Sequence, residues 1–341
     1  MIRPEPETAA RPAPQLVIRE PLASFLATLG VCWVALGVVA WEYARLRGIP
    51  ARVATPLAAS FLLEITFYLW PAFAVTRAWL SERGKYWAAL TLTLAGLAPW
   101  LIYSAGVGTF HWAAFLELLA IVGAVSFWYA VVSPTELADS LFLVMLAALV
   151  LAKVFDRIYL SPSPRLQIAV LGQLMLVHTA ALAIFTIRGH VNVEFRFLPN
   201  KAEWATGARF FVMMLPFAAA VYWILGLVHL RPHPLSVPLA AGTFFAILWV
   251  VALSEEFFFR GLLQQWLANW TRRGTAALII ASIVFGAAHL GFHGVFPNWR
   301  FATVAAVAGF FYGLAWRSSG TIQASMVTHA LTVTLWRVFL E

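Results

Sequence analysis

The chain has 341 residues, of which 62% are hydrophobic and only 11% carry a charged side chain. A soluble domain of this length contains roughly a quarter charged residues, so the composition excludes an ordinary soluble protein and predicts a polytopic membrane protein. The formal net charge of +8 comes mostly from arginine in short loops, which suits a bilayer with anionic headgroups. Nucleic-acid-binding surfaces typically carry a basic stripe with interleaved aromatic residues, and the sequence has none outside the apolar segments. The sequence therefore does not predict a nucleic-acid partner. The single cysteine, Cys32, excludes an internal disulfide and a cysteine metal cluster.

The chain begins with a Pro-rich segment of mixed charge, residues 1–21, which has no apolar core and no small-residue cleavage site. We expect a short disordered tail and not a signal peptide. The apolar segments that follow predict an all-α, polytopic transmembrane helical bundle of about 10–11 spans. These segments lie at about 22–41, 57–80, 87–104, 112–132, 137–155, 166–187, 209–230, 237–258, 275–291, 302–316 and 320–339.

The longest polar interval, 188–208, is predicted to be a connecting loop. It separates an N-terminal transmembrane region, 22–187, to which no role is assigned, from a C-terminal region, 209–341, that holds the chemistry. Lys and Arg are somewhat more frequent in the loops after even-numbered spans, which favours a cytoplasmic N-terminus. Ionisable residues within the N-terminal region, such as Glu64 and His178, are expected to pair with one another or to lie near the membrane interfaces.

Residues 254–261 read Ser-Glu-Glu-Phe-Phe-Phe-Arg-Gly and interrupt an apolar run that begins near Val237. We expect Glu255, Glu256 and Arg260 at or just beyond its membrane end, where an unpaired ionisable group costs several kcal/mol and therefore indicates a functional site. Glu256 and Arg260 are four residues apart and share a helix face, so they can pair. Glu255 is turned about 100° away and can face a cavity as a proton acceptor for water. The simpler interpretation is a solvated helix end.

Two later apolar segments each carry a histidine. His289 follows Phe285 by four residues, so the phenyl ring can orient the imidazole, which could bind and polarise an attacking water. His329 could donate a hydrogen bond to the oxyanion that forms when a carbonyl is attacked, a contribution of about 3–4 kcal/mol in a water-poor site. Each histidine could instead be a helix–helix hydrogen-bond donor, and His293 is the alternative to His289.

These residues resemble the motifs of the CPBP family, the CAAX prenyl protease and bacteriocin-processing intramembrane endopeptidases, also called Abi proteins. The family has Glu-Glu-xxx-Arg, then Phe-xxx-His, then a His followed four residues later by Asn or Asp. The resemblance covers residues 237–337, and the N-terminal two hundred residues carry no motif of this kind. The matching residues are Glu255, Glu256, Arg260, Phe285, His289 and His329, with Val333 at the last position.

The resemblance implies a role for each residue. Glu255 would activate water, with His289 as a second ligand of that water, and His329 would form part of the oxyanion site. Glu256 and Arg260 would support Glu255. The resemblance implies a glutamic-type peptidase without a cofactor, in a family formerly considered metallopeptidases. Zinc held by Glu255, His289 and His329 is the alternative.

The departure from the family pattern is Val333, which stands where a polar residue is usual. Thr332 or Thr334 could supply a hydroxyl, but each is rotated by about 100° from position 333. Gly309 and Gly313 are expected to allow close helix packing.

The predicted function is intramembrane hydrolysis of a peptide bond in a membrane-associated protein or peptide, such as a C-terminal anchor or sorting tail. The expected location is a bacterial inner (plasma) membrane, which a multi-pass chain of this composition suits. The alternative, favoured by Val333, is a non-catalytic protein of the same fold that acts in bacteriocin immunity, scaffolding or transport.

Overall fold

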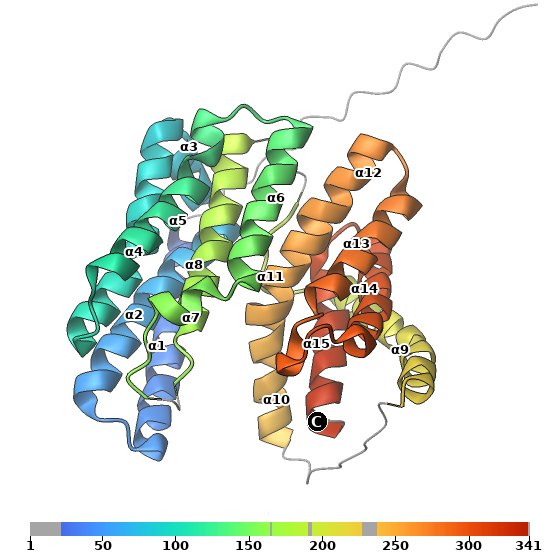
Figure 1. Cartoon of the computed structure of the whole chain (residues 1–341). Helices are drawn as coiled ribbons and strands as arrows, with labels where there is room; N and C mark the ends of the chain where they lie inside the picture. The colour runs from blue at the N-terminus through green and yellow to red at the C-terminus, as the bar shows by residue number, and fades with distance from the viewer. Residues whose placement is uncertain (1–21, 164–165, 190–192, 227–236, 340–341) are drawn as a thin grey trace, which may run out of the picture.

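The computed structural model describes residues 22–163, 166–189, 193–226 and 237–339, and over these ranges it contains helices and connecting segments without a strand. Figure 1 shows the helices in two groups that lie side by side, α1–α8 from blue to yellow-green and α9–α15 from yellow to red. The prediction of an all-α polytopic bundle is confirmed. The N-terminal tail, 1–21, lies outside the described residues.

The first group begins with long apolar helices and ends in a π-helical turn. Its elements are α1 (Leu22–Arg47), α2 (Ala51–Leu69), the 3-10 turn η1 (Trp70–Ala72), α3 (Ala74–Ser81), α4 (Lys85–Val107), α5 (Trp112–Val131), α6 (Glu136–Leu151), α7 (Val154–Ile158), α8 (Ala169–Leu182) and the π turn η2 (Ala183–Arg188).

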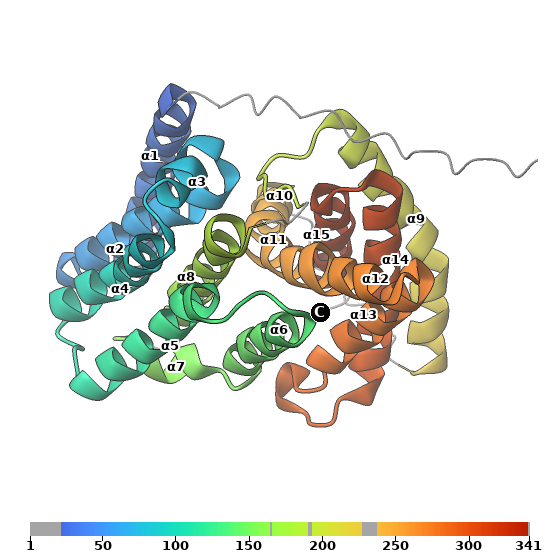
Figure 2. The same ribbon diagram turned by 90° about the horizontal axis from the view of Figure 1, so that it is seen from above.

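The second group contains the sequence motifs. Its elements are α9 (Lys201–Ile224), α10 (Val237–Ala246), the π turn η3 (Ile247–Ala252), α11 (Leu253–Glu256), the π turn η4 (Phe257–Gln264), α12 (Gln265–Thr271), α13 (Gly274–Ala288), the 3-10 turn η5 (Phe292–Gly294), α14 (Trp299–Ser319) and α15 (Ile322–Phe339). Figures 1 and 2 both show α9 on the side of this group that faces away from α1–α8.

Seven of the described helical stretches are long and apolar enough to cross a membrane, which makes this a multi-pass membrane protein. The number is smaller than the predicted ten or eleven because α6 and α13 have only 16 and 15 residues. In addition, α15 carries buried polar residues that reduce its hydropathy. The seven stretches are Leu22–Arg47, Ala51–Ala72, Lys85–Val107, Trp112–Val131, Ala169–Arg188, Lys201–Ile224 and Ala240–Thr271.

The last of these stretches carries the acidic motif. The helical run does not end near residue 258 but continues over 32 residues, from Ala240 to Thr271. It continues because the residues after the motif are also buried and apolar, Leu262 and Trp266 among them. Glu255, Glu256 and Arg260 therefore lie within a helical stretch that continues past the predicted end of the apolar run.

The two groups share one hydrophobic core. The Tyr68 hydroxyl on α2 donates to the Trp249 carbonyl on η3 at 2.9 Å, and the Trp249 indole donates to the Phe197 carbonyl at 3.0 Å. The Phe257 ring, directly after the two glutamates, packs edge-on against Phe195 with ring centroids 5.3 Å apart. These contacts hold the acidic motif against the segment that connects the two groups.

That connecting segment is shorter and more buried than the predicted loop at 188–208. Asn200 and Glu203 form a capping box, so α9 begins at Lys201 and not at residue 209. The Gln323 side chain on α15 donates to the carbonyls of Glu194 and Arg196, at 3.1 and 3.2 Å. Hydrogen bonds from the Gln323 side chain thus hold this segment against α15.

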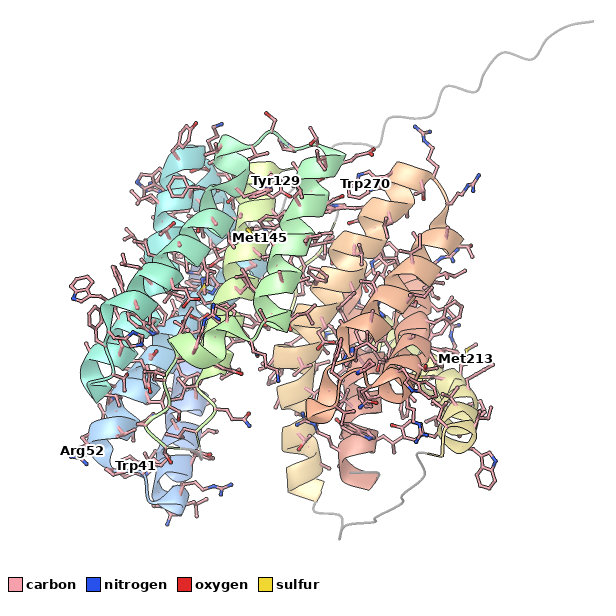
Figure 3. The ribbon with its side chains drawn as sticks, viewed as in Figure 1. Trp41, Arg52, Tyr129, Met145, Met213 and Trp270 are labelled. Carbon is pink, nitrogen blue, oxygen red and sulfur yellow. The ribbon has the colours of Figure 1, made fainter. Side chains whose placement is uncertain are left out.

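The buried ionisable residues of the N-terminal region are paired, as expected from their apolar surroundings. Glu64 and His178 are both buried and lie 2.8 Å apart. Asp139 pairs with Arg188 at 2.6 Å, and Arg188 also lies over the Trp266 ring of the second group at 4.9 Å. Figure 3 shows outward-facing side chains on the remaining surface, including the half-exposed Met213 on α9.

Candidate active site

The acidic motif lies on a helix whose turns are widened on both sides. Two residues, Glu255 and Glu256, end the single α-helical turn α11, and the π turns η3 and η4 flank it. Such π turns occur frequently at functional sites because the extra residue in a turn redirects the side chains that follow. The sequence pattern alone gave no sign of these turns.

Glu256 lies between a guanidinium and an imidazole. Its Oε2 is 3.2 Å from the Arg260 Nε, and its Oε1 is 2.9 Å from the His329 Nδ1 on α15. The side chains of Glu256 and Arg260 are fully buried, and that of His329 is 4% exposed. The four-residue spacing correctly predicts the Glu256–Arg260 pair. The bond to His329 joins residues 73 positions apart and comes only from the tertiary structure.

Arg260 is held by α14 as well as by Glu256. Its Nη2 donates to the Gly309 carbonyl at 2.6 Å, and its guanidinium lies over the rings of Phe285 and Tyr312, at 4.9 and 5.5 Å from their centroids. A Cβ at position 309 would stand 3.0 Å from the Phe285 ring and 3.3 Å from the Arg260 Nη2. Glycine at position 309 therefore permits the close approach of these groups, in line with the predicted packing role of the glycine pair.

The hydrogen bond to Glu256 determines which ring nitrogen of His329 is protonated. A carboxylate accepts hydrogen bonds, so the Nδ1 of His329 must be the donor. The Nε2 of a neutral His329 is then an acceptor, and it can donate only when the ring is an imidazolium. The predicted donation by His329 to an oxyanion therefore requires the doubly protonated ring.

Glu255 is turned away from the Arg260 pair, in the direction that the helical period predicts. Its side chain is 31% exposed, and its Oε2 lies 4.0 Å from the His329 Nε2. That distance is too long for a direct hydrogen bond, and a separation of this size is typically bridged by water. The Oε2 has no hydrogen-bond partner among the described residues. Glu255 is thus the carboxylate of the motif that remains free to take up a proton.

His289 lies at the C-terminal end of α13 and is oriented by Phe285. The His289 Nδ1 is 2.8 Å from the Phe285 carbonyl, and the two ring centroids are 4.8 Å apart. The Phe285 ring also lies 5.9 Å from the His329 ring, so it separates the two histidines. Donation by Nδ1 to the carbonyl leaves the Nε2 of His289 as an acceptor. The side chain of His293, the alternative to His289, lies outside the described part of the structure.

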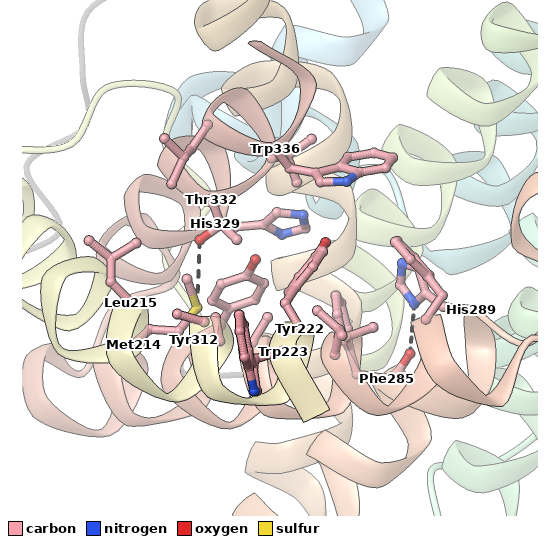
Figure 4. A pocket seen from close by; sticks show the side chains of 18 residues that line it. Met214, Leu215, Tyr222, Trp223, Phe285, His289, Tyr312, His329, Thr332 and Trp336 are labelled. Atoms are coloured by element: carbon pink, nitrogen blue, oxygen red, sulfur yellow. Dashed lines mark hydrogen bonds between the residues drawn. The ribbon is translucent and has the colours of Figure 1, made fainter. Parts of the chain in front are cut away.

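Both histidines line one pocket, with a volume of about 410 Å³, between α9, α13, α14 and α15. Figure 4 shows His329 and His289 on opposite sides of it, with the Tyr222 ring between them in this view and the Tyr312 ring next to His329. The lining is otherwise almost entirely apolar and contains neither an acidic side chain nor Lys or Arg. Glu255 is not among the lining residues, so His329 connects the pocket to the acidic motif. The sequence analysis missed both tyrosines, since a single tyrosine in an apolar helix has no distinctive pattern.

The three residues considered for the oxyanion site differ in position. Val333 and Thr332 line the pocket, whereas Thr334 does not. The Thr332 hydroxyl donates to the Thr328 carbonyl at 2.7 Å, so its proton is already committed. The Thr334 hydroxyl is buried without a partner among the described residues. Neither threonine replaces a polar residue at position 333.

The residues considered as zinc ligands do not converge on one point. Among the described residues, no group of three or more His, Cys, Asp or Glu side chains could hold a metal ion. Glu255 approaches His329, while His289 is turned to the Phe285 carbonyl. The donor set Glu255, His289 and His329 therefore does not fit a tetrahedral zinc site.

We predict that purified protein contains less than about one-tenth equivalent of zinc and keeps its activity after extended chelation, because its donors do not surround a common position. Metal content by mass spectrometry and cleavage before and after chelation would test this. Stoichiometric zinc whose removal and return switch cleavage off and on would contradict it.

Comparison with known proteins gives one match. Residues 237–335 match the family model for Rce1-like proteins, described as type II CAAX prenyl endopeptidase Rce1-like. The matched range contains all three motifs and every residue of the candidate site named above except Tyr222 on α9. A search of curated proteins and a search of solved structures each found no match. The C-terminal part of this membrane protein is therefore similar to Rce1-like type II CAAX prenyl endopeptidases, a similarity consistent with a CPBP family protein.

Proposed function

We propose that this chain is an intramembrane endopeptidase of the glutamic type, in which Glu255 activates the attacking water. The family match supports protease activity of the CAAX type. The substrate would be a membrane-embedded protein or peptide, and a C-terminal anchor or sorting tail is the kind of segment that fits. The proposed location is a bacterial inner membrane.

One observation carries this proposal: the two adjacent glutamates have different partners. Glu256 is bound on one oxygen by Arg260 and on the other by His329, while Glu255 is partly exposed and lies 4.0 Å from His329. Buried ionised groups cost stability even when paired. A cluster of four ionisable side chains inside an apolar helical bundle is therefore better explained by chemistry than by folding.

The proposed reaction begins with a water between Glu255 and His329. Glu255 takes a proton from this water as its oxygen attacks the scissile carbonyl carbon, and the carbonyl oxygen becomes an oxyanion. The imidazolium form of His329, stabilised by Glu256, donates to that oxyanion. Collapse of the tetrahedral intermediate breaks the C–N bond, and the proton held by Glu255 passes to the leaving amine. His289 would help to orient the water or the substrate through its free Nε2.

The pocket supports an apolar substrate. Apart from the histidines, tyrosines, one threonine and two tryptophans, its walls are aliphatic or phenyl groups, and it has room for several large side chains. Its outer wall is α9, the helix that lies at the edge of the bundle (Figures 1 and 2). An apolar segment that reaches the pocket past α9 would not need to leave the membrane, which favours a substrate that is itself embedded.

A cleavage assay in bilayer discs tests the proposal. The protein is incubated in ¹⁸O-labelled water with a library of single-span peptides whose apolar segments differ, and products are identified by mass spectrometry. Hydrolysis by an activated water should put one ¹⁸O atom into each new carboxyl group. Folded protein that cleaves no member of the library would favour the non-catalytic alternative in immunity, scaffolding or transport.

In the same assay we expect His329→Ala to lower kcat by about a hundredfold or more with a modest change in KM, because the oxyanion loses its charged donor. Since Glu256 also loses a partner, the folded fraction is measured by size-exclusion chromatography and the rate is given per folded molecule. A His329→Ala variant with the full rate would show that this histidine serves only packing.

A further inference from the structure

We propose that the Tyr312 hydroxyl is a second hydrogen-bond donor to the oxyanion, beside His329. This inference rests on the proposed function, and it assigns a role to a residue outside the three sequence motifs. It is based on the position of the Tyr312 ring, on the protonation that Glu256 imposes on His329, and on the apolar side chain at position 333.

The Tyr312 ring is held by two neighbouring side chains and through its backbone. It stacks on the His329 ring with centroids 4.6 Å apart and an angle of 15° between the planes, and the Arg260 guanidinium lies 5.5 Å from its centroid. The Ser325 hydroxyl on α15 donates to the Tyr312 carbonyl at 2.7 Å. The ring is 2% exposed overall. A donor held in this way needs no rearrangement when charge develops on the substrate, which is the property that makes oxyanion donors effective.

The hydroxyl of this ring reaches the pocket wall next to His329. Tyr312 and His329 both line the pocket, and Figure 4 shows the Tyr312 oxygen on the same side of the ring as the His329 imidazole. The phenol is therefore next to the place where the predicted oxyanion donor, His329, meets the substrate.

The other polar side chains in the pocket are less suited to donate a hydrogen bond to the oxyanion. Thr332 donates its proton to the Thr328 carbonyl. His289 uses its Nδ1 on the Phe285 carbonyl and is separated from His329 by the Phe285 ring. Tyr222 lines the pocket from α9, but none of the described aromatic rings packs against it to fix its position.

A tyrosine donor also compensates for the missing hydrogen-bond donor at position 333, where this chain has valine. In the CPBP pattern a polar residue is usual at this position, and here the side chain that lines the pocket is apolar. A neutral phenol donates a hydrogen bond without taking up a proton, whereas His329 donates only as an imidazolium. Tyr312 would thus supply the uncharged donor that position 333 lacks.

Tyr312→Phe tests this proposal because it removes the hydroxyl and keeps the stacked ring. We expect kcat to fall about a hundredfold with KM nearly unchanged, which is the size of effect seen when one oxyanion donor is lost. Tyr86→Phe, at an exposed position on α4, is the matched control and should cleave at the parent rate. Tyr222→Phe is the comparison within the pocket, and its loss of kcat should be smaller than that of Tyr312→Phe.

A second substitution separates hydrogen-bond donation from a structural role. Val333→Asn adds an amide donor one helical turn after His329, so Tyr312→Phe/Val333→Asn should regain at least about tenfold in kcat over Tyr312→Phe, a larger gain than Val333→Asn gives in the parent protein. Parent-level turnover of Tyr312→Phe, a loss as large in Tyr222→Phe, or no recovery in the double variant would overturn the assignment. If one of these outcomes occurs while the parent protein still cleaves with ¹⁸O incorporation, the proposed function stands and only the role of Tyr312 fails.

Discussion

Glu255→Gln is expected to abolish peptide cleavage while the protein stays folded. Glutamine has nearly the same shape as glutamate but cannot take a proton from water, and a positioned general base contributes about 10²–10⁴-fold to the rate. The fold should tolerate the change because the Glu255 side chain is 31% exposed and its Oε2 has no hydrogen-bond partner among the described residues. Cleavage rate per folded molecule and the thermal unfolding midpoint are the measurements.

Two further variants make this result specific. Glu136→Gln changes an exposed carboxylate at the start of α6 and should leave both cleavage and stability unchanged. Glu256→Gln should instead lower stability, because Glu256 is bound by Arg260 and His329 in the interior. Parent-level cleavage by Glu255→Gln would eliminate glutamate catalysis at this position, whatever the other two variants do.

Arg260→Ala is expected to reduce the folded yield and the activity together. Removal of one partner of a buried ion pair costs roughly 3–5 kcal/mol because the other charge stays buried and unpaired. Here Glu256 would keep only its bond to His329, and the Gly309 carbonyl would lose its donor at 2.6 Å. Arg273→Ala, at an exposed position before α13, is the control and should express and cleave like the parent.

The Arg260 prediction has a compensating variant. In Glu256→Gln/Arg260→Met the buried negative charge is removed, and methionine fills most of the space of the arginine stem. Part of the folded yield should therefore return, as measured by size-exclusion chromatography and thermal unfolding. A double variant no better folded than Arg260→Ala would show that Glu256 and Arg260 do not depend on one another.

Much of the local arrangement of the site follows from helical spacing. Residues four apart on one helix meet whatever surrounds them, and for this reason Glu256 with Arg260, and His289 with Phe285, were predictable in pairs. The same period turned Glu255 away from the arginine. Composition was enough for the all-α membrane class, since 62% hydrophobic residues cannot be buried in a soluble domain of this length.

The limits of the individual helices were less predictable. An apolar segment of spanning length marks a helix, but it does not show that α9 begins at the Asn200–Glu203 capping box. Nor does it show that the helical stretch with the acidic motif continues from Ala240 to Thr271. These limits depend on which residues find buried neighbours and capping partners.

The contacts between distant segments were decided by the tertiary structure alone. The sequence determined that Glu255, Glu256, Arg260, His289 and His329 are all present, and the spacing within each helix fixed the faces on which they lie. Only the packing of α15 against α11 brought His329 to Glu256, and only the packing of α14 against α15 brought Tyr312 to His329. Helical periodicity acts over a few residues, whereas a hydrogen bond between residues 73 positions apart depends on how whole helices dock.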